Sequence, residues 1–251
     1  MANPLTLNKE KNNESKINEI LEYNDNELNS LEYEEALIYD KRTFTQYYLS
    51  LLRINHLLLF SFYIKIKDYN SQIIKMFLFF FFFSVHFTIN ALFFNDDTMH
   101  KIFIDEGSFN FIYQIPQIIY SSLISGVIDV IINYLALSEK IILEIKKAET
   151  IKDLDEKVKD IFRILKIKFA LFFVFAFVLL SMFMYYITCF CGIYENTQIH
   201  LIKDTLISFG LSLIYPFGIY LVPGIFRTTA LRSENKDKEY LYKLSKFIGD
   251  L

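Results

Sequence analysis

The sequence predicts an all-α protein, a polytopic transmembrane helical bundle of about four spans with an interfacial helix and a cytoplasmic helical connection. Hydrophobic residues make up 53 % of the 251 residues and gather in long runs. Charged residues collect in the segments between these runs, which is typical of a multi-pass membrane protein rather than of a soluble core. Several runs reach about the twenty apolar residues that a helix needs to cross a bilayer.

The first segment, residues 1–42, is polar and acidic, and we expect it to be a largely disordered cytoplasmic segment. Asn29 and Ser30 precede an acidic turn, which favours the start of one short helix. The segment opens without a basic region followed by an apolar core, so no cleavable signal peptide is expected. It is interpreted as a solvated tail, with docking to a cytoplasmic partner as the alternative.

Residues 43–75 are expected to form an interfacial amphipathic helix region. The stretch 57–66 is strongly apolar but has only half the length of a span. Nearby tyrosines, together with Lys65 and Lys67, would anchor such a helix at headgroup depth. A further span through this stretch is the alternative, and it would change the topology.

The four-span membrane domain covers residues 76–227. Its spans are expected at residues 76–94, 116–137, 169–193 and 205–226. Lys and Arg are concentrated before the first span, between the second and third, and after the fourth. By the positive-inside rule both termini therefore face the cytoplasm. The last segment, 228–251, is expected to be a cytoplasmic amphipathic tail that could lie on the membrane, with Leu241, Leu244 and Phe247 on one face.

The cytoplasmic helical loop, residues 139–168, contains apolar residues spaced three and four apart. This seam, typical of a coiled coil, consists of Ile151, Leu154, Val158, Ile161 and Leu165. Only about two heptads are present, so two interpretations stay open. The seam packs on a neighbouring stretch of the same chain, or it joins copies of the chain in a homo-oligomer.

A polar ridge on the second span is the sharpest signal in the sequence. Its members follow one another at four-residue intervals: Gln117, Ser121, Ser125, Asp129 and Asn133. In a helix this spacing places them along one face, which must meet other helices, water or a partner charge. Two polar residues of the first span, His86 and Asn90, lie near the level of Asp129 if the second helix starts at Pro116, and about one to two helical turns from it if that helix starts earlier. The ridge is either a proton or cation path or a helix-packing surface, and a His86–Asp129 pair is one possibility.

The fourth span contains helix-breaking residues and is expected to be interrupted. These residues are Pro216, Gly218, Pro223 and Gly224. Broken helices line ion sites in some transporters, whereas kinks are more often satisfied by neighbouring helices.

Several stretches resemble a family of uncharacterised multi-pass membrane proteins of protists. They are YDKRTFTQYYLSLL (39–52), NALFFNDDTMHKI (90–102), NTQIHLIKDTLISFGLSLIYPFG (196–218) and LVPGIFR (221–227). The resemblance begins near Leu28 and covers most of the chain from there on. It implies a short member of that family, or its membrane module alone, and it carries no known activity or binding residues.

Neither enzymatic chemistry nor a cofactor is expected, because no nucleotide loop, hydrolase elbow or zinc-protease helix occurs. Cys189 and Cys191 lack further ligands, so we expect no metal site. Basic residues are interleaved with acidic ones, so we expect no nucleic-acid binding. The expected partners are the lipid bilayer and either further copies of the chain or other subunits of a membrane complex. The leading hypothesis is a non-enzymatic module that anchors or assembles a membrane complex. The alternative is a small ion or proton channel or transporter that uses Asp129 and the broken fourth span.

Overall fold

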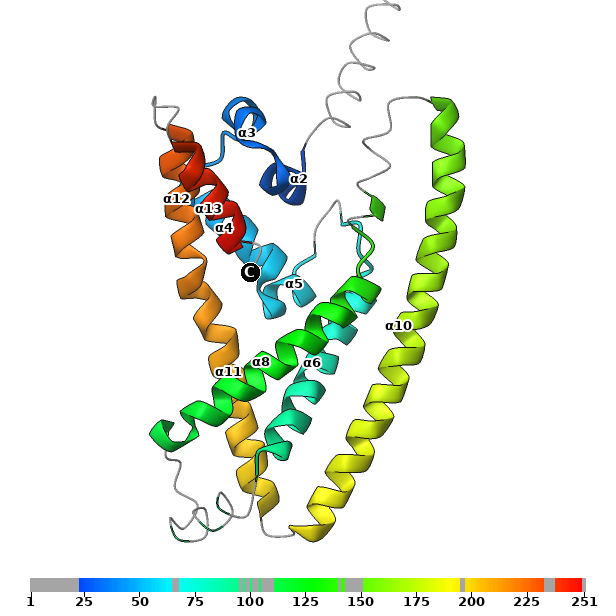
Figure 1. Ribbon diagram of the computed structural model, residues 1–251, viewed down its shortest axis with the longest axis vertical. Helices are drawn as coiled ribbons and strands as arrows, with labels where there is room; N and C mark the ends of the chain where they lie inside the picture. Colours follow the sequence, from blue (N-terminus) through cyan, green and yellow to red (C-terminus); the bar gives the residue numbers. More distant parts are fainter. Residues whose placement is uncertain are drawn as a thin grey trace, which may run out of the picture. The chain divides into compact units, whose positions relative to one another are not determined.

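The protein is all-α over the residues that the structure describes, as the sequence predicts (Figure 1). The computed structural model describes residues 23–64, 68–94, 111–139, 141–142, 151–194, 197–232 and 238–249 and positions 97, 100 and 104, with the backbone alone at 111–114, 117–118 and 151–157. Four helical segments are long and apolar enough to span a membrane: Gln72–Leu92, Ile119–Ala136, Val158–Ile193 and Gln198–Arg232. They agree in number and order with the four predicted spans.

The chain divides into two compact units. The terminal unit combines the two chain ends, Met1–Ile54 and Phe217–Leu251, and the central unit is Asn55–Pro216. Two segments that are far apart in sequence therefore share one core in the terminal unit.

Helix α6 (Gln72–Leu92) is the core of the central unit, where it packs against α5 (Leu57–Phe62), α8 (Phe111–Ala136) and α10 (Ile151–Ile193). The hydrophobic core is completed by α8 and α10, and its buried members are Leu78, Phe81, Phe82, Val85, Ile89, Ile132, Ala136, Phe172 and Ala176. The opposite faces of α8 and α10 keep large apolar side chains exposed, among them Val127 and Phe177. Exposed apolar faces of this kind suit helices that are surrounded by lipid.

Helix α10 is one unbroken helix of 43 residues (Figure 1). At 1.5 Å per residue it is about 65 Å long, more than a bilayer requires. The helix therefore continues through residue 168, where the sequence predicted a boundary between connection and span. No proline occurs in this stretch, and its first glycine is Gly192, so nothing interrupts the helix. Its buried positions Ile161, Phe172 and Ala176 continue the seam spacing into the span, so the described part of the seam belongs to a face packed within the chain.

The predicted interfacial region contains two helices, α4 (Phe44–Asn55) and α5, separated at His56. The backbone N–H of Leu59 donates to His56 Nδ1 at 3.5 Å, and Nε2 lies 2.7 Å from the Leu213 carbonyl. His56 thus caps α5 and ties it to α11 (Gln198–Ile219). With six residues, α5 is too short to cross a bilayer, so the alternative of a further span does not hold here.

The described residues 23–42 differ from the prediction of a largely disordered segment with one helix. They form α2 (Asp25–Ser30) and α3 (Tyr33–Tyr39). Asn24 and Glu27 make a reciprocal capping box with two 2.8 Å bonds that starts α2. Tertiary burial stabilises both helices further, because Leu31, Tyr33 and Ala36 pack with Ala230 and Tyr242 of the other chain end. Residues 1–22 lie outside the described part.

Helix α13 (Glu239–Gly249) lies beside α12 (Leu221–Arg232) in the terminal unit (Figure 1). Its buried face is formed by Tyr242, Ser245 and Gly249, and the Ser245 hydroxyl donates to the Pro223 carbonyl at 2.7 Å. The predicted apolar face of Leu241, Leu244 and Phe247 is not the buried face, since Phe247 remains 64 % exposed. The buried face of α13 thus combines the large Tyr242 ring with the small residues Ser245 and Gly249.

The interruption of the fourth span falls at Tyr220, between α11 and α12. Pro216 and Gly218 lie inside α11 near its end, and Pro223 lies in the first turn of α12, where its missing N–H costs nothing. Gly224 has a packing role rather than a breaking one. A Cβ atom on Gly224 would lie 2.8 Å from Phe44 Cε2, so this glycine lets α4 and α12 approach closely.

Candidate functional site

The polar ridge of α8 lies on the face that packs in the central unit. Ser121 and Ser125 are buried on this face, while Gln117 lies in α8 with its side chain outside the described part. The Ser125 hydroxyl donates to the Ser121 carbonyl at 2.6 Å. This bond stays within the helix, so the Ser125 proton satisfies local backbone rather than a neighbouring helix.

Asp129 and Asn133 follow one turn apart on the same face, and each is half-buried. Their Oδ1 atoms are both buried without a hydrogen-bond donor among the described residues. Ile132 and Ala136 beside them are buried in the apolar core. A buried acceptor without a donor costs free energy, because it loses the hydrogen bonds that it makes when it is solvated. These two oxygens therefore do not join the described helices.

His86 and Asn90 of α6 contact α11 instead. His86 Nε2 lies 2.9 Å from Ser208 Oγ, and Asn90 Nδ2 donates to Thr205 Oγ1 at 3.0 Å. All four side chains are buried. The possible His86–Asp129 pair is thus replaced by a His86–Ser208 hydrogen bond, because the face of α6 that carries His86 and Asn90 packs on α11. Four residues that are distant in sequence form a buried polar ladder between two candidate spans.

Thr205 and Ser208 were not singled out by the sequence analysis. A signal was present, because Asp204, Ser208 and Ser212 repeat the four-residue spacing of the α8 ridge within the fourth span. Asp204 and Ser208 are both buried. The same criterion applied to every apolar stretch would have identified this second polar face.

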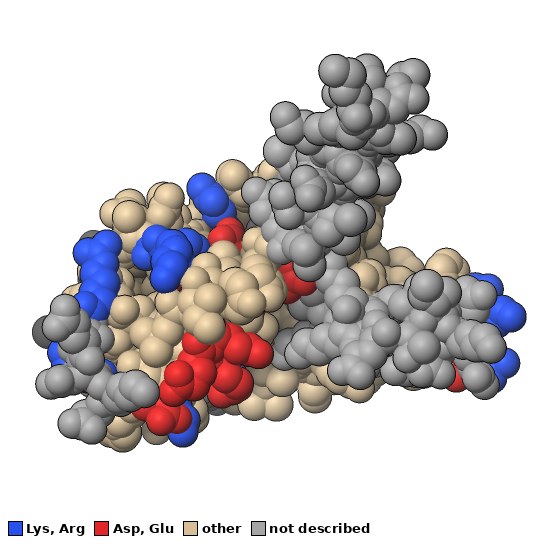
Figure 2. Space-filling view, turned by 90° about the horizontal axis from the view of Figure 1, so that it is seen from above, with Lys and Arg blue, Asp and Glu red and all other residues tan. Residues whose placement is uncertain are grey.

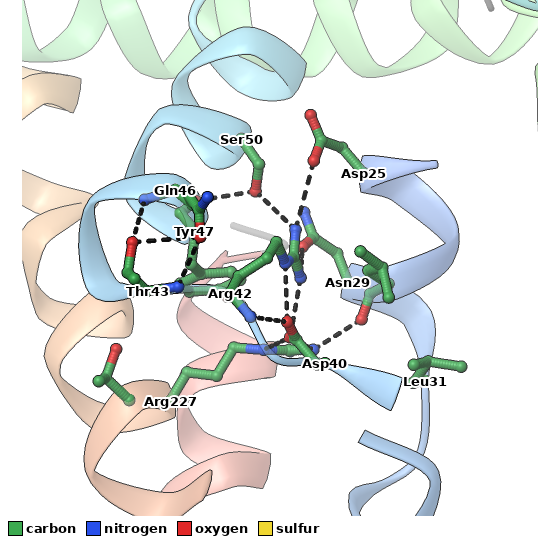
Figure 3. Close-up of polar contacts among 12 residues, drawn as sticks. Asp25, Asn29, Leu31, Asp40, Arg42, Thr43, Gln46, Tyr47, Ser50 and Arg227 are labelled. Carbon is green, nitrogen blue, oxygen red and sulfur yellow. Dashed lines mark hydrogen bonds and ion pairs between the residues drawn. The ribbon is translucent and has the colours of Figure 1, made fainter. Parts of the chain in front are cut away.

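A second polar site lies in the terminal unit, where Asp40 accepts hydrogen bonds from two arginines (Figure 3). Arg42 binds it through both Nε, 2.8 Å from Oδ1, and Nη2, 2.9 Å from Oδ2. Arg227 of α12 reaches Oδ2 through Nε at 2.9 Å and Nη2 at 2.8 Å. Asp40 and Arg227 are 6 % and 1 % exposed, so this ion pair is almost completely buried.

The two arginines also bind the surrounding helices. Arg42 donates to Ser50 Oγ at 3.0 Å and to Asn29 Oδ1 at 2.8 Å, which connects α4 with α2. Arg227 Nη2 donates to the Leu28 carbonyl at 2.6 Å. These bonds make Asp40 the centre of a network that joins the beginning of the chain to its end.

Two aromatic rings cover the Arg227 guanidinium. The Tyr47 and Tyr242 ring centroids each lie 4.7 Å from its Cζ, and this geometry supports cation–π attraction. The Tyr242 hydroxyl donates to the Leu31 carbonyl at 2.8 Å. Burial raises the pKa of Tyr242 to about 12, so this ring stays neutral. Arg227 Nη1 is buried without a hydrogen-bond partner among the described residues.

The charge of Asp40 is stabilised by its partners. Burial alone would raise the pKa of Asp40, but the hydrogen bonds and positive charges of Arg42 and Arg227 outweigh this effect and hold the pKa below its ordinary value of 3.8. Sequence reasoning interpreted Arg227 only as part of the basic stretch after the fourth span. Asp40 and Arg227 stand 187 residues apart, and no local pattern predicts such a pairing.

Among the described residues, no three His, Cys, Asp or Glu side chains gather closely enough to hold a metal ion. Cys189 is exposed and Cys191 is half-buried, and both are free thiols. Comparison of the chain with protein-family models, curated proteins and solved structures finds no match. The fold and the sites therefore identify only the class of protein. It is a multi-pass helical membrane protein with four candidate spans.

Proposed function

We propose that the protein is a non-enzymatic membrane module that anchors or assembles a membrane complex. One observation carries the proposal: the polar ladder joins α6 to α11 through His86–Ser208 and Asn90–Thr205. Interhelical hydrogen bonds of this kind hold helices together in lipid, where the hydrophobic effect does not. These intramembrane polar groups thus serve architecture, and the broad exposed apolar faces of α8 and α10 leave room for lipid or for helices of other subunits.

The proposed orientation places both termini in the cytoplasm. It is supported by Lys and Arg in the segments before α6, between α8 and α10, and after α12. In this orientation the terminal unit presents its surface to cytoplasmic partners.

A second candidate function, an ion or proton channel or transporter, is favoured by a different observation. Asp129 and Asn133 retain buried oxygens without a donor among the described residues. Intramembrane carboxylates of this kind often mark ion or proton paths. A donor from another subunit would satisfy the same oxygens, which agrees with the assembly proposal.

Flux through the purified full chain in liposomes separates the two candidates. Proton and potassium flux is measured for wild type, for Asp129→Asn, and for a matched control, Ser84→Ala, at a half-buried position of α6. The assembly proposal expects the flux of all three to equal that of empty liposomes, with Asp129→Asn changing only the stability or the association state of the protein.

Flux that Asp129→Asn abolishes and Ser84→Ala preserves would overturn the assembly proposal. The variant must keep the wild-type circular dichroism spectrum and incorporate equally well for this outcome to count. Asp129 would then be a residue of a transport path.

A further inference from the structure

A pocket with an excess of positive charge opens beside the Asp40 network. Its volume is about 230 Å³, and its lining includes Lys41, Arg42, Arg227 and Arg232 but only one acidic residue, Asp40. Small-molecule sites commonly measure about 300–1,000 Å³, so this pocket suits a small charged group better than a whole metabolite.

Two guanidinium groups, those of Arg42 and Arg227, line the pocket beside the single carboxylate of Asp40. Asp40 contributes one negative charge, which Arg42 and Arg227 share. The nearest further carboxylate, Asp25, lies 3.5 Å from Arg42 and is partly exposed. Arg227 is 1 % exposed and its Nη1 has no described acceptor. A buried guanidinium nitrogen without an acceptor is costly, so an additional anion in the pocket would stabilise this arrangement.

The rim of the pocket adds two exposed cations, Lys41 and Arg232. Lys41 Nζ donates only to the Leu37 carbonyl, at 2.8 Å, and Arg232 has no hydrogen bond or ion pair within the described part of the chain. In the space-filling view, several Lys and Arg side chains gather at one side of the main acidic group (Figure 2). The rim charges are therefore available to a ligand that enters from outside.

The surroundings favour a lipid as the source of that anion. Apolar residues of α12 that precede the arginines are exposed, with Leu221, Val222 and Ile225 at 41–53 %. Ile38 of α3, next to the lining residue Leu37, is 64 % exposed. Arg227 and Arg232 thus lie at the end of an apolar helix that belongs to a candidate span. Basic side chains at this position meet lipid headgroups.

We propose that this pocket binds the phosphate group of an anionic phospholipid. The exposed Lys41 and Arg232 contact the phosphate oxygens, and Arg42 and Arg227 supply the positive field beneath them. The acyl chains lie along the exposed apolar residues of α12. This inference does not rest on the proposed function, because a lipid site is compatible with either an assembly module or a transporter.

The test is a titration of the purified full chain in neutral detergent, with lipid retention followed by native mass spectrometry. The probes are dioctanoyl phosphatidic acid, dioctanoyl phosphatidylcholine and inorganic phosphate. Arg227 itself holds Asp40, so the test variant changes the rim instead: Lys41→Gln combined with Arg232→Gln. The matched control is Lys159→Gln combined with Lys243→Gln, two exposed lysines outside the pocket.

Phosphatidic acid is expected to bind, with phosphatidylcholine and inorganic phosphate much weaker. The rim variant should bind phosphatidic acid roughly 25-fold more weakly, from about fivefold for each basic side chain, while the control stays near wild type. Equal weakening in both double variants would overturn the site. Inorganic phosphate that binds as tightly as the lipid, with the same sensitivity to the rim variant, would overturn the lipid as ligand and indicate a soluble phosphate.

Discussion

The α6–α11 contact of the central unit and the Asp40 network of the terminal unit stabilise buried polar groups in different ways. In the central unit, α6 and α11 are joined by uncharged hydrogen-bonding side chains, with His86 on Ser208 and Asn90 on Thr205. In the terminal unit, Asp40 is bound by two guanidinium groups. Both contacts are buried, and buried charges are costly unless each has a partner, which Asp40 has in Arg42 and Arg227.

The comparison shows that removing one partner of a polar contact should destabilise the two units to different extents. Removing one side of an uncharged pair leaves a modest deficit, whereas removing one side of a buried ion pair leaves an uncompensated charge. The exceptions are Asp129 and Asn133 on α8, whose Oδ1 atoms resemble neither solution because no described donor reaches them. The following predictions compare the two units directly.

The largest effect is expected for Asp40→Ala, which leaves Arg42 and Arg227 buried without their shared carboxylate. The free energy of unfolding should fall by about 3–5 kcal/mol. Thermal and chemical unfolding in detergent, followed by circular dichroism, measures the loss. Glu239→Gln, which removes the exposed ion pair with Lys243, is the control and should change nothing measurable. Equal effects of the two substitutions would contradict the structural role of the Asp40 network.

Acidification should weaken the same network by a smaller amount, because it removes the charge of Asp40 and keeps the side chain. The pKa of Asp40 is held below 3.8 in the folded state, so its contribution to stability is present in full above that pH. The contribution is lost as the pH falls through the folded pKa, below 3.8. Unfolding midpoints between pH 2 and 7 test this, and Asp40→Asn should flatten the acid limb relative to wild type.

Gly224→Leu should destabilise the terminal unit by about 2 kcal/mol, because the new side chain collides with the Phe44 ring. Phe44→Ala in the same chain should restore part of the loss by making room. Gly210→Leu is the matched control, since nothing lies within 4 Å of a Cβ atom at that position. A Gly224→Leu protein as stable as wild type would show that α4 and α12 do not need this close contact.

The smallest effect is expected in the central unit, where Ser208→Ala breaks one rung of the polar ladder. Pairs of this kind contribute on average about 0.6 kcal/mol and at most about 1.7 kcal/mol in membrane proteins. A double-mutant cycle with His86→Leu isolates the coupling between the two side chains. Coupling indistinguishable from zero would mean that the ladder does not hold α6 to α11.

The sequence predicted what depends on local composition and period. Long apolar runs identified the all-α class and all four candidate spans, because a bilayer sets a minimum length that is readable without a structure. The four-residue spacing placed Ser121, Ser125, Asp129 and Asn133 on one face of α8, and the structure shows the two serines buried on that face. The unbroken α10 was only partly anticipated, since its seam and its span were treated as separate elements.

Long-range contacts decided the rest. Residues 23–42 were expected to be largely disordered because their composition is polar, yet α2 and α3 are packed against the opposite end of the chain. The Asp40–Arg227 pair, the exclusion of a Cβ at Gly224 and the choice of α11 as partner for His86 each depend on segments more than a hundred residues apart. Periodicity fixes which face of a helix is polar, because it is a property of one segment. Which segment that face meets is decided by tertiary packing, because the free energy of the contact belongs to both partners.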